Sequence, residues 1–114
     1  MEINHDKSVD VEKLATISMQ VILHAGNARA SLFKAIDSAS NYDFKIADEL
    51  LETANDDLTE AHRVQTETMQ LEAEGIQVPY SVLFSHAQDT LMTVKSEQNL
   101  IKEMIKLYKR IGEK

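Results

Sequence analysis

Apolar residues recur every three or four positions along three long stretches of this chain. That spacing puts the apolar side chains on one face of a helix, so it predicts three amphipathic helices. We expect the first helix over residues 10–38, with Ser8 or Asp10 as its N-cap. The second is expected to end at about residue 72, and the third to run over 81–111.

Two segments that disfavour helix separate these stretches. The first is SASNYD, with Asn41 as a candidate cap, and the second is EAEGIQVPY. In the second segment Gly75 suits a helix C-terminus, and Pro79 prevents an early restart. Gly26 lies inside the first predicted helix, where glycine costs about 1 kcal/mol relative to alanine, so we interpret it as a kink or a close helix contact. The pattern predicts an all-α, antiparallel up-down-up three-helix bundle.

The third predicted helix carries two apolar stripes instead of one. The first stripe is a heptad seam with a single polar interruption: Phe84, Ala87, Leu91, Val94, Gln98, Ile101, Ile105 and Tyr108. The second consists of Leu100, Met104, Leu107 and Ile111. A helix in a three-helix monomer needs only one wide stripe, so the second predicts packing against other subunits. Continued toward the N-terminus at helical spacing, the second stripe passes Asp89 and His86.

Length and composition narrow the class of protein. The 114 residues suit one domain, with residues 1–8 expected to be a flexible tail. The net charge of −7, with acidic residues spread along the chain, argues against nucleic acid and anionic membranes as partners. Cysteine is absent, and there is no apolar run of membrane-spanning length or signal peptide. We therefore expect a soluble cytoplasmic protein without direct membrane insertion.

His86 and Asp89 are the candidate chemical groups, and each also has a simpler interpretation. A helical histidine is more often a buried or interfacial hydrogen-bonding residue than a reactive one, and His24 and His62 fit that description. Asp89 can be a solvated carboxylate or a partner that holds the tautomer of His86. Alternatively, neutral imidazole is a good nucleophile at cytoplasmic pH. None of the predicted helices contains the Glu-x-x-His pairs of di-metal bundles, which disfavours a metal-storage or redox protein.

The segments LTEAHRVQT and SVLFSHAQDTLMT closely resemble the IIA component of the lactose/cellobiose (N,N'-diacetylchitobiose) branch of the bacterial sugar phosphotransferase system. ILHAGNARA in the first helix and LIKEMIKLYKRI at the end of the third extend this resemblance to the full length. The segment His-Ala-Gln-Asp followed by Leu-Met-Thr is its most specific part. The resemblance implies a single domain of this family over residues 1–114.

The resemblance also implies a function as a phosphotransferase component, with no complete enzyme activity of its own. Members accept a phosphoryl group from the phosphocarrier protein HPr on a histidine, which corresponds to His86 as a tele-phosphohistidine. They pass it to a cysteine of the cognate IIB component, and the sugar is phosphorylated during uptake through the membrane permease IIC. Family members form homotrimers with nine helices. The aspartate that binds a metal at the trimer axis corresponds to Asp89, and Gln88 is the positioning residue of the same motif.

The chemistry of these residues agrees with the implied roles, with one departure. Three Asp89 carboxylates meeting on a three-fold axis would repel one another without a cation, and Mg²⁺ with its preference for oxygen ligands suits a structural role there. Many members have a second histidine where this chain has Thr90, so an auxiliary role of that histidine is in doubt here.

The sequence does not distinguish whether the transported sugar is lactose, cellobiose or diacetylchitobiose. The alternative function is a non-catalytic helical adaptor or regulator that acts through protein contacts.

Overall fold

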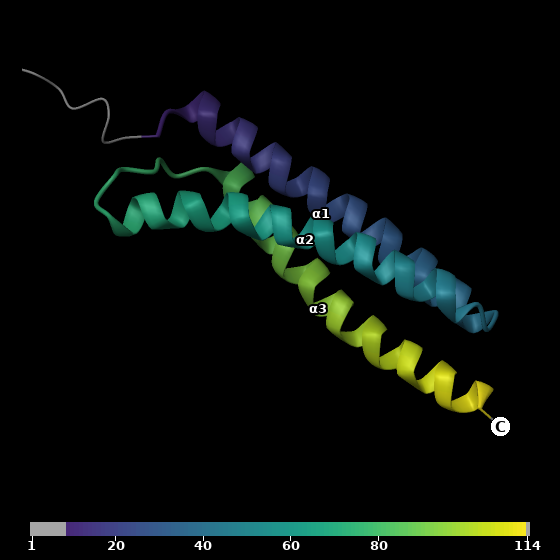
Figure 1. Ribbon diagram of the computed structural model, residues 1–114. Coiled ribbons are helices and arrows are strands. Elements are labelled where there is room, and N and C mark those ends of the chain that lie inside the picture. Colours follow the sequence, from purple (N-terminus) through teal and green to yellow (C-terminus); the bar gives the residue numbers. More distant parts are fainter. Residues whose placement is uncertain (1–8, 114) are drawn as a thin grey trace, which may run out of the picture.

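The computed structural model describes residues 9–113, which form three α-helices in up-down-up order (Figure 1). The helices are α1 (Val11–Ser40), α2 (Phe44–Ala73) and α3 (Val82–Gly112). The predicted all-α fold is confirmed, and each helix ends within two residues of the predicted boundary. The expected flexible tail over residues 1–8 lies outside the described residues.

Each helix begins after a residue whose side-chain oxygen accepts a hydrogen bond from the backbone N–H three positions later. These N-caps are Asp10, Asp43 and Ser81, with distances of 2.7, 3.3 and 3.0 Å respectively. The bonds satisfy backbone donors that have no partner inside the helix. Asn41, predicted as a cap, is the C-cap of α1. Gly75 follows the C-cap of α2 with φ +90°, the left-handed conformation that favours glycine.

Gly26 differs from its prediction. Helix α1 continues through it without a break, and its position is exposed to solvent. A Cβ atom added there would meet nothing within 4 Å, so no other helix approaches closely. The predicted close helix contact is therefore wrong, because this glycine lies on the outward face of α1.

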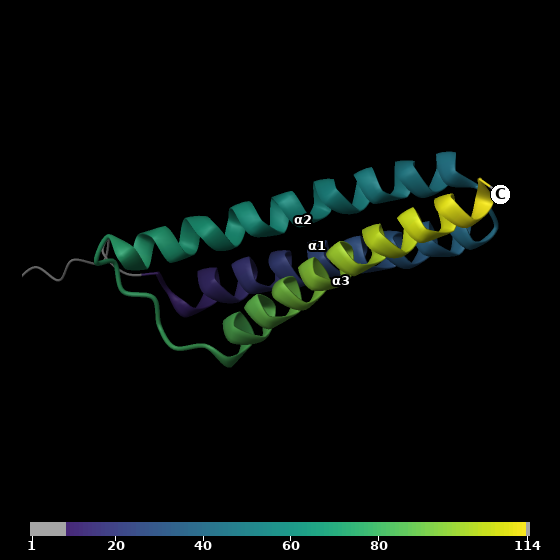
Figure 2. The same ribbon diagram turned by 90° about the horizontal axis from the view of Figure 1, so that it is seen from below.

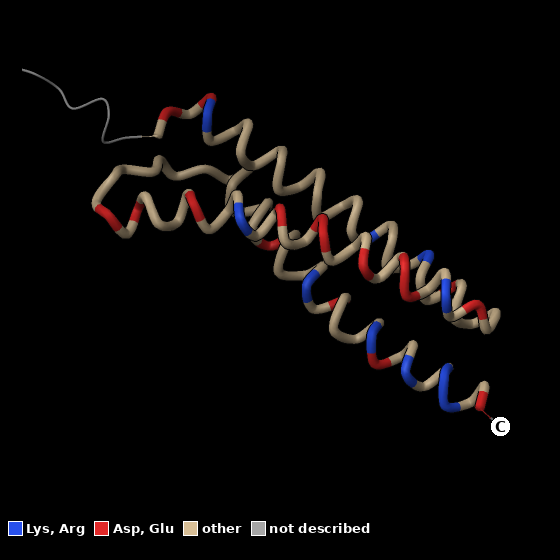
Figure 3. The backbone as a smooth tube through the Cα atoms, in the orientation of Figure 1, with Lys and Arg blue, Asp and Glu red and all other residues tan. Residues whose placement is uncertain are grey.

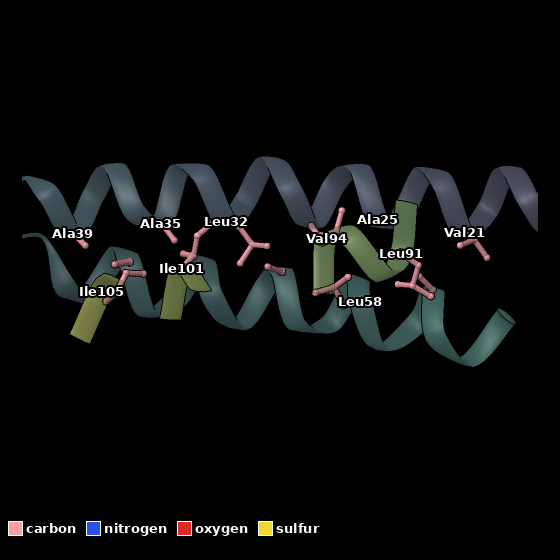
Figure 4. Close-up of a cluster of buried hydrophobic side chains, with 14 of the residues drawn as sticks. Val21, Ala25, Leu32, Ala35, Ala39, Leu58, Leu91, Val94, Ile101 and Ile105 are labelled. Carbon is pink, nitrogen blue, oxygen red and sulfur yellow. The ribbon is translucent and has the colours of Figure 1, made fainter. Parts of the chain in front are cut away.

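The core lies along α1, which packs against both α2 and α3. Figure 2 shows α2 and α3 farther apart at the end that holds the α2–α3 loop than at the C-terminal end. Alanines supply much of the α1–α2 contact, and larger side chains from all three helices fill the remaining space (Figure 4). The seam predicted on α3 is the buried one: its six members from Ala87 to Ile105 are all buried, and Gln98 is only 1% exposed.

Each pair of helices is also joined by one polar side-chain bond near the middle of the bundle. The three bonds join His24 to Asp57 (2.9 Å), Arg29 to Glu97 (2.8 Å) and Gln98 to Asn55 (3.1 Å). Every helix contributes two residues no more than five positions apart. Polar contacts of this kind favour one register between the helices, because a shift along the axis would separate the bonded partners.

Candidate functional site

His86 lies in the second turn of α3, shortly after the Ser81 cap. Its side chain is exposed, and its imidazole forms no hydrogen bond or ion pair with residues 9–113. A ring nitrogen of a neutral imidazole in this position keeps a free lone pair. The interpretation of His86 as a buried, hydrogen-bonded core histidine does not hold in this structure.

Asp89 lies on the same outward side of α3, three residues after His86. Its carboxylate is exposed and has no ion pair or hydrogen bond among the described residues. The two side chains, although neighbours along the helix, are not bonded to each other, so Asp89 does not hold the tautomer of His86 here. The structure brings both residues to one exposed face but leaves them as separate groups.

The side chain of Gln88 points to the side of α3 opposite His86. Two residues along an α-helix correspond to a rotation of about 200°, so the side chains of Gln88 and His86 point in nearly opposite directions. Gln88 is half-buried and lines a cleft of about 330 Å³ between the end of α2 and the start of α3, together with Met69 and Phe84. Within one protomer, Gln88 therefore does not lie beside the His86 ring.

Thr90 stands where the resembled family often has a second histidine. Its hydroxyl donates a 2.8 Å hydrogen bond to the backbone carbonyl of His86, one turn earlier. Threonines in helices commonly make this bond. The sequence pattern did not reveal it, because the bond depends on the side-chain rotamer of Thr90.

Asp89 is the candidate ligand for a metal ion. Residues 9–113 contain no group of three or more His, Cys, Asp or Glu side chains arranged to hold a metal. Asp89 offers one exposed carboxylate that is free of other described partners. Its oxygen atoms suit a hard cation such as Mg²⁺, so the donor type fits, with the remaining ligands supplied by other copies or by water.

The other histidines have different surroundings. His24 Nδ1 lies 2.9 Å from the Asp57 carboxylate, which confirms it as a hydrogen-bonding residue between helices. His62 is exposed on α2 and makes no hydrogen bond to the described residues. On the same helix, a hydrogen bond from Arg63 lowers the pKa of the Glu60 carboxyl.

The second apolar stripe of α3 faces away from the core, as predicted. Leu100, Met104, Leu107 and Ile111 are all exposed. Part of this stripe lines an apolar cavity of about 390 Å³ together with Ile36 of α1 and Tyr108. The protomer thus presents a continuous apolar surface on the same side of α3 as Asp89, which is typical of a surface that binds another protein.

Known proteins resemble this chain in both sequence and structure. Residues 16–109 match the profile described as "PTS system, Lactose/Cellobiose specific IIA subunit". The chain is 39% identical over 99 residues to the lactose-specific EIIA component of Lactococcus lactis, covering 87% of this chain and 94% of the relative. The crystal structure of the cellobiose-specific enzyme IIA from Bacillus anthracis is 38% identical with a TM-score of 0.85, covering 93% of this chain and 95% of that chain. The IIA(Chitobiose) of Escherichia coli, solved in complex with HPr, is 31% identical with a TM-score of 0.77, covering 87% and 96%. Among the described residues, no helix has the length and apolarity needed to cross a membrane.

Proposed function

Because this chain belongs to the lactose/cellobiose-specific IIA family of the sugar phosphotransferase system, we propose that it is a phosphoryl carrier whose acceptor is His86. The observation that carries this proposal is the exposed imidazole of His86, which has no bonded partner in residues 9–113 and stands in the motif SHAQD. An acceptor histidine must reach a phosphoryl group held by another protein, and exposure provides that access. Neutral imidazole supplies the nucleophile without a separate base.

The proposed reaction moves one phosphoryl group twice. The bond between phosphorus and the phosphorylated side chain of HPr breaks, releasing that side chain, as a new N–P bond forms at Nε2 of His86. That bond breaks in turn when a cysteine thiolate of the cognate IIB component attacks phosphorus. Phosphoryl transfer of this kind requires mainly alignment and stabilisation of the charge on the equatorial oxygens. An HPr complex of a related IIA supports HPr as the donor.

The physiological setting is proposed from the family. We place this carrier in the cytoplasm, where it would act upstream of a membrane permease IIC. The relatives named above are specific for lactose, cellobiose and chitobiose, so the substrate class is a disaccharide of that group. The IIA component need not contact the sugar.

A homotrimer is the assembly we propose, with α3 at its centre. The exposed stripe from Leu100 to Ile111 supplies the apolar surface for such an assembly. Asp89 lies farther toward the N-terminus on the same side and would approach its copies at the three-fold axis. There the three carboxylates would hold a structural Mg²⁺, and the positive charge of the ion would offset the repulsion between them.

Gln88 takes its proposed positioning role between protomers. On α3, His86 and Gln88 lie on opposite sides of the direction in which Asp89 points. If Asp89 faces the axis, the Gln88 side of one α3 turns toward the His86 side of the next. The carboxamide of Gln88 is therefore proposed to orient the acceptor histidine of a neighbouring subunit.

A phosphorylation assay tests the acceptor. The protein is incubated with HPr, its kinase and phosphoenolpyruvate, and the modified residue is located by mass spectrometry. We expect one acid-labile phosphate at His86, no labelling of His86→Gln, and full labelling of the matched control His62→Gln. Labelled His86→Gln would contradict the assignment. An unlabelled wild-type protein would instead favour the adaptor function.

A further inference from the structure

Tyr42, in the turn between α1 and α2, has a backbone conformation that few bulky residues adopt. Its φ is +61°, in the left-handed region, and it follows Asn41, the C-cap of α1. Helices most often have glycine at this position, because glycine has no Cβ to strain the backbone. Backbone hydrogen bonds close the turn, among them a 2.9 Å bond from the Tyr42 N–H to the Ala39 carbonyl. The turn itself therefore gives no reason for a tyrosine at this position.

The Tyr42 ring contacts residues of the other two helices. It packs edge-on against Phe44, the first residue of α2, with ring centroids 6.1 Å apart and an interplanar angle of 77°. Gly112, the last residue of α3, lies against both rings. A Cβ atom added to Gly112 would be 3.2 Å from Cδ1 of Tyr42 and 3.4 Å from Cε2 of Phe44. Glycine thus lets the end of α3 approach these two rings, which we call the aromatic pair.

Lys109 adds a second contact between α3 and this end of the bundle. Its Nζ lies 6.0 Å from the centroid of the Phe44 ring, and 3.0 and 3.1 Å from the two carboxylate oxygens of Asp48. Figure 3 shows mostly acidic residues along α2 and mostly basic residues along the second half of α3, so their charges are complementary. Lys109 and Gly112 are three residues apart, which places both on one side of α3, facing the aromatic pair.

The last two turns of α3 have few buried contacts. Ile105 is the last buried residue of this helix, and residues 106–112 include none. Helix ends of this kind open locally at a low cost in free energy. The same turns carry Leu107 and Ile111 of the exposed stripe. These two side chains point away from the aromatic pair, because the step from Leu107 to Lys109 is a rotation of about 200°.

We propose that the aromatic pair is a conformational device that fixes the last two turns of α3 and so presents Leu107 and Ile111 to a neighbouring copy in one orientation. The strained backbone of Tyr42 is retained because it places the ring under Gly112. A helix end that is already ordered loses less conformational entropy on association. The presentation to a neighbouring copy rests on the proposed homotrimer, whereas the fixing of α3 applies to a single chain.

Tyr42→Asn separates the role of the ring from that of the backbone. Asparagine adopts the left-handed conformation more readily than tyrosine, so the turn is kept while the ring is lost. Hydrogen exchange is compared among proteins in the same state of assembly. We expect exchange of residues 106–112 to be about tenfold faster in Tyr42→Asn, and exchange in the middle of α3 to be unchanged. Unchanged exchange of residues 106–112 would overturn the device.

Two controls keep the test specific to the ring. Tyr42→Phe retains the ring and should exchange like the wild type. Tyr80→Asn makes the same change at an exposed tyrosine of the α2–α3 loop and should also match it. Gly112→Val approaches the contact from the other side: valine favours helix more than glycine, so faster exchange at the end of α3 must come from the rings. If Gly112→Val has the same effect with and without Tyr42→Asn, the close contact is refuted.

Sedimentation tests the link to assembly. The proposed trimer of Tyr42→Asn should dissociate at about tenfold higher concentration than that of the wild type, because its α3 ends must be ordered on association. Faster exchange with unchanged dissociation would overturn the presentation of the stripe. A wild-type protein that sediments as a single chain would refute the proposed homotrimer itself. In that case the exchange experiments still decide whether the aromatic pair fixes the end of α3.

Discussion

Gln98 of α3 donates a 3.1 Å hydrogen bond from its carboxamide nitrogen to the side-chain oxygen of Asn55 on α2. Gln98 is buried to 1% exposure, whereas Asn55 is exposed. The bond is therefore asymmetric: Asn55 can turn to water if it is broken, but the Gln98 amide cannot. Burial of an unpaired polar group costs more than the bond itself contributes.

That asymmetry predicts different effects from the two ends of the bond. Asn55→Ala should lower the free energy of unfolding by about 1–2 kcal/mol, because it leaves the buried Gln98 amide without its partner. Gln98→Leu should be neutral or stabilising, because it removes the buried polar group and releases Asn55 to solvent. Urea unfolding followed by circular dichroism measures both. A Gln98→Leu variant less stable than Asn55→Ala would show that packing, and not the hydrogen bond, dominates at this position.

Gln65 offers a second test of buried polar groups. Its Oε1 atom is buried in α2 and accepts no hydrogen bond from residues 9–113, while the residue is only 6% exposed. Gln65→Met keeps a similar shape without the unpaired oxygen, so we expect it to raise the free energy of unfolding by about 1 kcal/mol. The exposed glutamine Gln70 on the same helix provides the control, since Gln70→Met should leave stability nearly unchanged. A destabilised Gln65→Met would mean that the oxygen has a partner such as a bound water.

Ser81 is the N-cap of α3, the helix that carries the proposed acceptor His86. Its hydroxyl oxygen accepts a 3.0 Å bond from the Phe84 N–H at the start of the helix that carries His86. Ser81→Ala should destabilise the protein by about 1 kcal/mol and speed hydrogen exchange in the first turns of α3. Ser81→Asp should restore protection, because aspartate also caps well. Asp10→Ala removes the α1 cap and should leave hydrogen exchange at the start of α3 unchanged. If Asp10→Ala speeds exchange there as much as Ser81→Ala does, the effect of the Ser81 cap is not local.

Asp89→Leu tests the proposed metal and assembly together. In the proposed trimer, leucine would remove three converging carboxylates and add apolar surface, so the assembly should become insensitive to chelator and at least as stable. Analytical ultracentrifugation with and without EDTA measures both effects. The wild-type trimer should dissociate more readily in EDTA, and a wild-type trimer that is indifferent to chelator would exclude the structural metal. Asp37→Leu, an exposed carboxylate on α1, is the control and should retain chelator sensitivity.

Several parts of the fold and the site were predictable because they depend on local pattern. The three-four spacing of Leu14, Val21 and Leu32 predicted an inward face, and all three are buried. The seam of α3 that was predicted to pack in the bundle is buried, and the second stripe lies outside the core of the single chain, where its packing against other subunits stays a prediction. Periodicity alone placed His86 and Asp89 on the same side of α3 as its second apolar stripe, and in the single chain both residues are exposed on that side.

Other features required the folded chain. The residues around Gly26 do not reveal whether another helix packs against it, and only the folded structure shows that none approaches. The neighbouring motif positions of His86 and Gln88 suggested one site, but the helical rotation separates them within a protomer. By itself, the sequence determined the helices, their caps and their buried faces, because these follow from interactions within a few residues. Tertiary structure decided the register that joins Arg29 to Glu97 and Asn55 to Gln98, because register depends on contacts between residues far apart in the chain.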